Sequence, residues 1–184
     1  TLCDIVLVCL PTSNHVRALL DGPDGLATGL RPGCLVIDQT TGDPAVTREL
    51  AAALAARGVA LVDAPVSGGA AGARAGTIAI MVGGNDEACA RAMPVLQAIS
   101  PNVFRAGEVG AGHVMKLVNN MLSAAQRLAS MEALSLAAKN GIEPKRACDI
   151  LLAGGARNAF LEKAMPAVLK GDLAPGFTLA LMHK

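Results

Sequence analysis

The sequence is poor in aromatic residues: they make up 2% of its 184 residues, and tryptophan and tyrosine are absent. Single-stranded nucleic acids are usually held by stacking their bases on aromatic rings, so this composition argues against such a partner. The net charge is only +1 and there is no run of basic residues. Neither a nucleic-acid backbone nor an acidic membrane surface is therefore indicated as a partner.

Long hydrophobic runs and paired cysteines are also missing. No apolar run approaches the roughly 18 residues of a membrane-spanning helix, and there is no charged-then-apolar leader. The five cysteines form no C-x-x-C pair and the three histidines are dispersed. These spacings predict reduced thiols, a cytoplasmic protein and no metal site. The 52% of hydrophobic residues are enough for the core of one domain or one and a half.

The first part of the chain alternates apolar strands with helices. Continuous apolar runs predict strands over 4–9, 34–38 and 59–63. A helix of about two turns separates the first pair, and a helix over 44–57 with Asp43 as its N-cap separates the second. This order predicts a parallel sheet, whose ligands bind beyond the carboxyl ends of the strands. The loops that leave those ends are polar or contain glycine: Leu10-Pro11-Thr12, Thr40-Thr41 and 64–69.

The second part of the chain becomes entirely helical. Before it, we predict that the loop beginning at Ala64 continues to Gly76, followed by a strand over 77–82, a helix over 85–100 that Pro94 kinks or divides, and a short strand over 102–105. A long helix then begins near Gly110 and ends at Asn140 before Gly141, followed by helices over 143–152 and 158–170. The chain is therefore predicted to be α/β, with a sheet domain over 1–109 and an all-α domain over 110–184.

The long helix carries two polar residues one turn apart, Lys116 and Asn120, which share one face. Such a pair alone is more often a solvated lysine beside a capping asparagine. His113, one turn before Lys116, could face the same site, but we expect it to be solvated, as is commoner for a histidine at a helix start. Three methionines are predicted to fill the core: Met115, Met121 and Met131.

Two glycine-containing segments are candidates for ligand binding. Ser67-Gly68-Gly69 could hold a substrate carboxylate with its N–H groups and the Ser67 hydroxyl, although a flexible turn is the alternative. Gly110-Ala111-Gly112 imitates the first half of a dinucleotide fingerprint. We reject it as a phosphate loop because Met115 replaces the third glycine and no parallel strand follows.

In order along the chain, four motifs together resemble the β-hydroxyacid dehydrogenase family. This family includes 3-hydroxyisobutyrate dehydrogenases, tartronate semialdehyde reductases and, more distantly, 6-phosphogluconate dehydrogenase. The matching motifs are Leu10-Pro11-Thr12, the D-x-[ST]-T-x-x-P loop over 38–44, the substrate signature over 63–69, and G-x-G-x-x-x-K-x-x-N-N over 110–120. A weaker fifth match over 171–177 leads to Lys184.

The resemblance implies hydride transfer between NAD or NADP and a short hydroxy acid or semialdehyde such as 3-hydroxyisobutyrate. It implies that Lys116 is the general acid/base and that Asn120 holds the reacting oxygen or orients the lysine. A lysine suits this role because burial lowers its pKa from about 10.4 towards the working pH. The implied substrate-binding residues are Ser67, Gly68, Gly69 and Phe177, and the implied cofactor-binding residues are Leu10, Pro11, Thr41 and Lys184.

The resemblance also bears on the extent of the chain. It places the glycine-rich phosphate loop in a first βαβ unit upstream of Thr1 and continues the helical domain beyond Lys184. We therefore expect a piece of a longer protein: the C-terminal half of a Rossmann-like domain and part of an all-α substrate and oligomerisation domain. The 184 residues alone are expected to bind dinucleotide poorly, and a homo-dimer or homo-tetramer is expected.

Two other functions stay open from the sequence. One is a non-catalytic, dehydrogenase-like binding domain. The other is a reductase that acts on a different small carbonyl acid, such as glyoxylate or succinic semialdehyde. The particular hydroxy acid and the choice between NAD and NADP are not decided by these residues.

Overall fold

The computed structural model describes residues 3–172 of the chain. It divides into two compact units, Thr1–Val118 and Asn119–Lys184, with the division inside the long helix α6 (Ala111–Lys139). Phe177 and Lys184, and with them most of the fifth motif, lie outside the described residues.

The first unit contains a sheet whose first three strands are parallel, as predicted. These are β1 (Ile5–Val8), β2 (Leu35–Asp38) and β3 (Ala60–Asp63). Their register places Val8 beside Asp38 and Asp38 beside Asp63. The carboxyl ends of the three strands therefore meet at one edge of the sheet, where the predicted loops begin.

Two of the remaining strands, β5 (Ala79–Gly83) and β6 (Val103–Gly107), run in the opposite direction to the first three. β5 is antiparallel to β3, and β6 is parallel to β5. The two-residue strand β4 (Val66–Ser67) also pairs antiparallel with β5. Both predicted strands over 77–82 and 102–105 are thus present, with bounds shifted by one or two residues.

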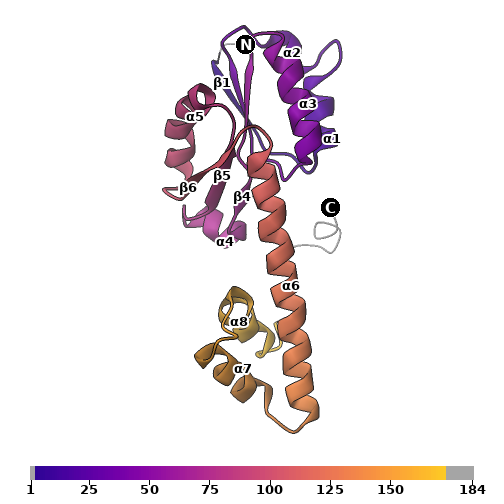
Figure 1. Ribbon diagram of the computed structural model, residues 1–184, viewed down its shortest axis with the longest axis vertical. Coiled ribbons are helices and arrows are strands. Elements are labelled where there is room, and N and C mark those ends of the chain that lie inside the picture. The colour runs from indigo at the N-terminus through magenta and orange to yellow at the C-terminus, as the bar shows by residue number, and fades with distance from the viewer. Residues whose placement is uncertain (1–2, 173–184) are drawn as a thin grey trace. The chain divides into compact units, whose positions relative to one another are not determined.

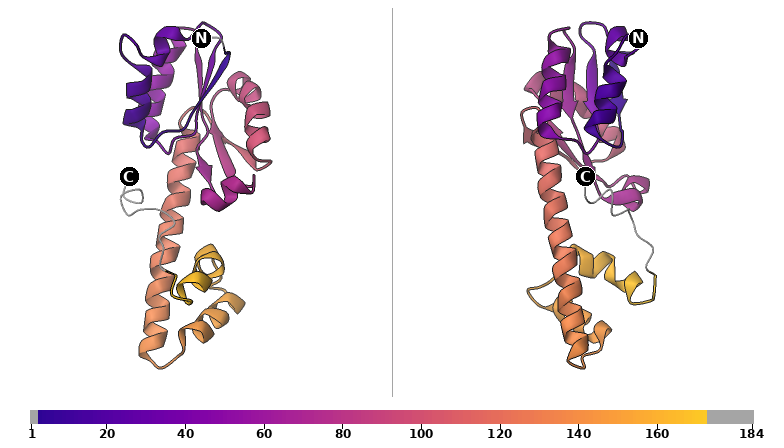
Figure 2. Two further views of the ribbon diagram at one scale, coloured as in Figure 1. Left: turned by 180° about the vertical axis from the view of Figure 1, so that it is seen from behind. Right: turned by 90° about the vertical axis from the view of Figure 1, so that its right-hand side faces the viewer.

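Helices cover both faces of this sheet (Figures 1 and 2). One face carries α1 (Ser13–Leu20), α2 (Leu26–Gly29) and α3 (Pro44–Ala55), and the other carries α5 (Asp86–Ile99). Successive strand side chains point to opposite faces, so Val36 packs in the first core and Ile37 in the second. The predicted N-cap of α3 is confirmed, since the Asp43 carboxylate accepts the N–H of Ala45 at 2.8 Å.

Two local predictions in this unit need correction. The segment predicted as a loop from Ala64 to Gly76 contains β4 and also α4 (Gly69–Arg74), because three alanines in six residues favour a helix in spite of the glycines. Arg74 therefore lies in the last turn of a helix rather than in a loop. Pro94 lies inside α5, which is one helix, so of the two predicted effects the division is wrong and the kink stays a prediction.

The second unit is helical. After the end of α6, where Gly141 has a φ of +80°, come α7 (Pro144–Ala153), α8 (Ala159–Lys163) and α9 (Met165–Val168). A single helix predicted over 158–170 is wrong. Pro166 has no N–H to donate to the preceding turn, so α8 ends and a new short helix begins. Leu134, Cys148 and Leu161 form the core of this unit.

The three methionines predicted as core residues are exposed within the described chain. Met115, Met121 and Met131 are 44%, 68% and 48% exposed, because α6 turns other residues such as Leu134 towards the core. The five cysteines are free thiols. Among residues 3–172, no helix combines the length and the apolar character needed to cross a membrane.

We expect replacement of Leu35 by alanine to lower the free energy of unfolding by about 2–5 kcal/mol, because a fully buried side chain leaves a cavity. Leu7→Ala is the matched control on the neighbouring strand. Leu7 is 41% exposed, so its truncation should cost about 0.5 kcal/mol or less. Urea unfolding followed by circular dichroism measures both; equal losses would contradict this assignment of the core.

Candidate active site

The loops that follow β1 and β2 are joined by a hydrogen bond. The backbone N–H of Leu10 donates to the Thr40 hydroxyl at 3.1 Å, and the N–H of Thr40 donates to the Asp38 carboxylate at 2.9 Å. Leu10 and Pro11 lie in the first loop and Thr41 in the second. The structure therefore brings together the two loops that were predicted to bind the cofactor.

Asp63, the last residue of β3, connects the sheet to α6. It is fully buried, and its two carboxylate oxygens accept N–H groups from Gly110 at 2.6 Å and from His113 at 2.8 Å. The first N–H groups of a helix have no partner inside the helix, and this carboxylate satisfies two donors at that end. Asp63 therefore caps a helix whose first bonded N–H group, that of Gly110, lies 47 residues later in the chain.

Burial raises the pKa of Asp63 above the ordinary value of an aspartate. The N–H groups of Gly110 and His113 and the nearby imidazole of His113 act in the opposite direction, because they stabilise the ionised form. The cost of burying the charge is the larger effect.

His113 is fully buried, so the prediction of a solvated histidine is wrong. Its Nε2 lies 2.7 Å from the carbonyl oxygen of Thr40, and its Nδ1 lies 2.7 Å from the hydroxyl of Thr47. The physical reason is that α6 begins against the edge of the sheet, where its first turn is enclosed by the loop after β2 and by α3. Sequence reasoning missed the burial of His113 and the capping role of Asp63; the available signals were a carboxylate ending an apolar strand and a histidine in the first turn after Gly-x-Gly.

Steric contacts explain the glycines at the start of α6. A Cβ at Gly112 would lie 2.3 Å from the carbonyl oxygen of Met81 and 2.8 Å from an Asp63 carboxylate oxygen. A Cβ at Gly83 would lie 2.6 Å from the other carboxylate oxygen. The glycines therefore allow the helix to approach the sheet closely, a role that needs no phosphate.

Lys116 lies on α6 one turn after His113 and is 9% exposed. Asn120 lies on the same helix, in the second unit, where its side-chain oxygen accepts a hydrogen bond from the Asn119 amide at 3.3 Å. Their spacing of one turn is as predicted.

The predicted carboxylate-binding residues lie where β4 passes into α4. Ser67 ends β4 and is half-buried. Gly68 and Gly69 have φ values of +137° and +64°, which side chains other than glycine rarely adopt. The tight change of direction at this point therefore requires these two glycines.

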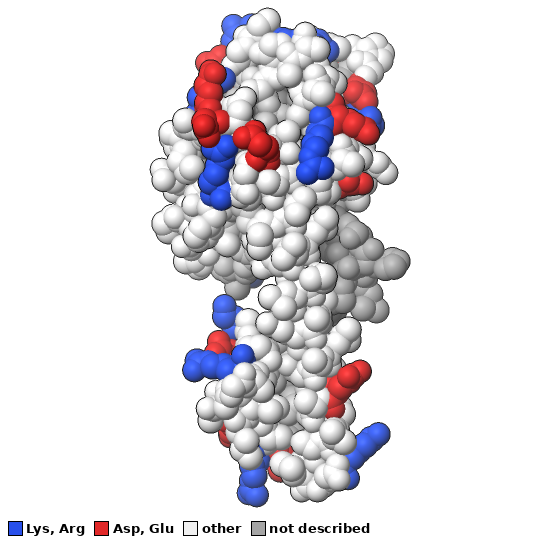
Figure 3. Space-filling model, in the orientation of Figure 1, with Lys and Arg blue, Asp and Glu red and all other residues white. Residues whose placement is uncertain are grey.

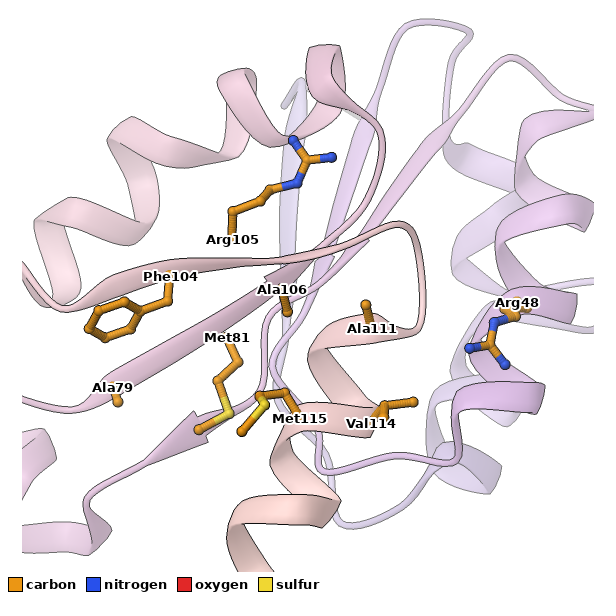
Figure 4. Close-up of a pocket in the computed structure, with 9 residues that line it drawn as sticks. All are labelled: Arg48, Ala79, Met81, Phe104, Arg105, Ala106, Ala111, Val114 and Met115. Atoms are coloured by element: carbon orange, nitrogen blue, oxygen red, sulfur yellow. The ribbon is translucent and has the colours of Figure 1, made fainter.

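Figure 4 shows an apolar pocket of the first unit. It is lined by residues of α3, β5, β6 and the start of α6: Arg48, Ala79, Met81, Phe104, Arg105, Ala106, Ala111, Val114 and Met115. Arg105 bonds to the Asp86 carboxylate and to the carbonyl of Gly84, both at 2.6 Å. On the face drawn in Figure 3, basic side chains are interspersed with acidic ones. The pocket thus offers apolar surface rather than a set of reactive groups.

The chain matches two protein-family models. Residues 1–107 match the NAD binding domain of 6-phosphogluconate dehydrogenase. Residues 110–184 match a model described as NAD-binding of NADP-dependent 3-hydroxyisobutyrate dehydrogenase.

Several characterised proteins are similar to the chain. An NAD-dependent L-serine dehydrogenase and a 3-hydroxyisobutyrate dehydrogenase, both of Pseudomonas aeruginosa, are each 41% identical to it, with 98% of the chain and 63% of the relative covered. The solved structure of Mycobacterium tuberculosis 3-hydroxyisobutyrate dehydrogenase with L-serine has a TM-score of 0.87 at 36% identity, covering 98% of the chain and 64% of that structure. The chain thus spans a little under two thirds of the length of these relatives. The similarity confirms the predicted Rossmann-like α/β fold.

We expect Gly112→Ala to destabilise the first unit by about 1–3 kcal/mol, because the added methyl group meets backbone oxygen and forces α6 away from the sheet. Gly155→Ala is the matched control, since a Cβ there has no described atom within 4 Å. Thermal unfolding of both variants measures the difference. A Gly112 variant as stable as the control would show that α6 does not depend on this close approach.

Asp63→Asn tests whether burial raises the pKa of the Asp63 carboxyl. Because the folded-state pKa is raised, the contribution of this carboxyl to stability is complete below about pH 4 and is lost as the pH rises through the folded-state pKa. We expect the free energy of unfolding of the wild type, minus that of Asp63→Asn, to fall with rising pH. Urea unfolding of the wild type and of Asp63→Asn between about pH 4 and pH 8 measures this difference in the free energy of unfolding. A difference that rises with pH would mean that the N–H groups outweigh burial.

Proposed function

Since the chain belongs to the β-hydroxyacid dehydrogenase family, we propose that it is part of an NAD(P)-dependent oxidoreductase that interconverts a short hydroxy acid and its semialdehyde. The observation that carries this proposal is the position of Lys116. It is a nearly buried lysine on a helix whose first turn is bonded to the end of β3 and to the loop after β2. A titratable group held on a rigid element beside the ligand-binding edge of a parallel sheet suits proton transfer.

In the proposed reaction, the Nζ of Lys116 accepts the hydroxyl proton of the substrate during oxidation and returns it to the carbonyl oxygen during reduction. Bound NAD or NADP would supply the hydride acceptor. Proton transfer by a positioned side chain typically contributes about 10²–10⁴-fold in rate. Asn120 would hold the reacting oxygen or orient Lys116, since it follows one helical turn later.

The residues at the sheet edge fit the cofactor. The strands β1, β2 and β3 end together there, and the loops that carry Leu10, Pro11 and Thr41 are bonded to each other. We propose that these three residues contact the dinucleotide, with Lys184 reaching it from the end of the chain. Ser67, Gly68 and Gly69 would hold the substrate carboxylate, and Phe177 would form one wall of the substrate site.

The names of the relatives suggest a narrower substrate class. L-Serine and 3-hydroxyisobutyrate are both 3-hydroxypropanoates with a small group on C2. We propose this class as the substrate: a primary alcohol, a carboxylate two carbons away and a small C2 group. The alternative reductase, acting on glyoxylate or succinic semialdehyde, needs a carboxylate at a different distance from the carbonyl.

The domain assignment follows the same proposal. Residues 1–109 would be part of the dinucleotide-binding domain and residues 110–184 part of the all-α substrate and oligomerisation domain. The five free thiols favour a reducing compartment such as the cytoplasm. A homo-dimer or homo-tetramer is proposed from the relationship to the family.

The test is turnover of the gene product with a panel of hydroxy acids, followed by the absorbance of reduced nicotinamide. The panel holds L-serine, 3-hydroxyisobutyrate, glycerate, threonate and 4-hydroxybutyrate, each with NAD and NADP. We expect turnover of a 2-substituted 3-hydroxypropanoate, and a loss of about 10²–10⁴-fold in kcat for Lys116→Ala because the proton acceptor is missing.

Lys139→Ala is the matched control, an exposed lysine in the last turn of the same helix. It should retain wild-type kcat. If Lys116→Ala retains it too, proton transfer belongs to another group. Cofactor binding without turnover of any panel member would favour the non-catalytic binding domain.

A further inference from the structure

The His113 imidazole bonds to two elements other than its own helix. Its Nε2 lies 2.7 Å from the Thr40 carbonyl oxygen, in the loop after β2, and its Nδ1 lies 2.7 Å from the Thr47 hydroxyl, on α3. The ring is fully buried, so water does not compete for either nitrogen. One side chain of α6 therefore bonds to the loop after β2 and to the helix that follows it.

The bonding pattern determines which ring nitrogen must carry hydrogen. A carbonyl oxygen only accepts, so Nε2 carries a hydrogen and donates it to Thr40. The Thr47 hydroxyl has one hydrogen: either it donates that hydrogen to the Asp43 carbonyl at 2.9 Å and accepts from Nδ1, or it donates to Nδ1 and gives up the bond to Asp43. The bridge from α6 to the loop therefore exists in either protonation state of the ring.

The loop after β2 is packed directly against this imidazole. A Cβ at Gly42 would lie 2.9 Å from Cε1 of His113 and 2.7 Å from the Ser13 hydroxyl oxygen. The Ser13 hydroxyl in turn accepts the N–H of Asp43 at 2.7 Å. The loop segment that contains Thr41 is thus enclosed between α1 and the His113 ring, with no room for even a methyl group.

Two anchors hold the first turn of α6 in different ways. The Asp63 carboxylate bonds to backbone N–H groups at the helix end, and the His113 ring bonds sideways to the loop and to α3. Lys116 follows His113 by three residues, so their side chains project to neighbouring sides of the helix. A sideways displacement or rotation of the first turn would therefore displace Lys116 as well.

We propose that His113 is a positioning residue, which couples the loop after β2 to the first turn of α6 and so sets the position of Lys116. The proposal rests on the proposed function of Lys116 as the proton-transfer group. It also extends that function. The His113 side chain fixes the position of the loop with a proposed cofactor contact relative to the helix with the proposed acid/base.

The bridge is tested by three substitutions in the gene product. His113→Leu keeps a similar volume and removes both bonds. His113→Gln places an amide nitrogen near the position of Nε2 and can keep the bond to Thr40. Thr47→Val leaves the imidazole in place and removes the partner of Nδ1, together with the bond from the Thr47 hydroxyl to the Asp43 carbonyl, so it tests the contact of His113 with α3 if His113→Leu does not fold. His15→Leu is the matched control, since His15 is an exposed histidine whose Nδ1 also bonds to a threonine hydroxyl.

The first readout is amide hydrogen exchange, which does not depend on activity. We expect His113→Leu to speed exchange over 110–117 on the order of tenfold, with smaller effects for Thr47→Val and His113→Gln and none for His15→Leu. Exchange over 123–139, later in α6, should not change. Unchanged exchange over 110–117, or an equal rise along the whole helix, would overturn the proposal.

The second readout is steady-state kinetics with the substrate found in the panel. We expect His113→Leu to lower kcat on the order of 10–100-fold with a smaller change in KM, and His113→Gln to restore most of the loss. A wild-type kcat in His113→Leu, alongside a large loss in Lys116→Ala, would overturn the positioning role while leaving the proposed function intact. If the wild type turns over no hydroxy acid, the proposed function fails, and hydrogen exchange alone decides whether His113 holds the first turn.

Discussion

The structure depends on one buried carboxylate at the point where the sheet meets the long helix. Transferring an aspartate from water to a protein interior costs several kcal/mol unless the charge is compensated. Two backbone N–H groups at the start of α6, where the helix dipole also favours negative charge, offset part of this cost. The same bonds satisfy donors that the helix would otherwise leave without partners. Asp63 thus couples the end of β3 to the beginning of α6. The carboxylate and the N–H groups of the helix each supply the hydrogen-bond partner that the other needs.

The close approach of α6 to Asp63 requires glycine at two neighbouring positions. The helix can approach Asp63 only because Gly112 and Gly83 have no Cβ, and both glycines face carboxylate or carbonyl oxygens at less than normal contact distance for a methyl group. A Gly-x-Gly before a helix is usually considered as part of a phosphate loop. In this chain it is a steric requirement for packing a helix onto a sheet, which agrees with the absence of a third glycine from the motif.

The same region links the two chemical parts of the proposed enzyme. A general acid/base accelerates a reaction only if it is held at the correct place relative to substrate and cofactor. Lys116 lies one turn beyond the anchored residues, and the loop with Thr41 packs on His113. Thr41, the proposed cofactor contact, and Lys116, the proposed proton acceptor, are therefore both held in place through His113 and its hydrogen bonds, within the first unit.

The sequence by itself determined the elements whose signals are local. Continuous apolar runs identified β1, β2 and β3, an Asp-Pro pair identified the start of α3, and a long periodic pattern ended by Gly141 identified α6. These signals were readable because they act within a few residues. Only the tertiary structure decided that Asp63 caps α6, that His113 is buried, and that Met121 and Met131 are exposed. The partners of Asp63 are 47 and 50 residues away and those of His113 66 and 73, so no local pattern encodes them. Burial of a helix face likewise depends on which elements pack against it.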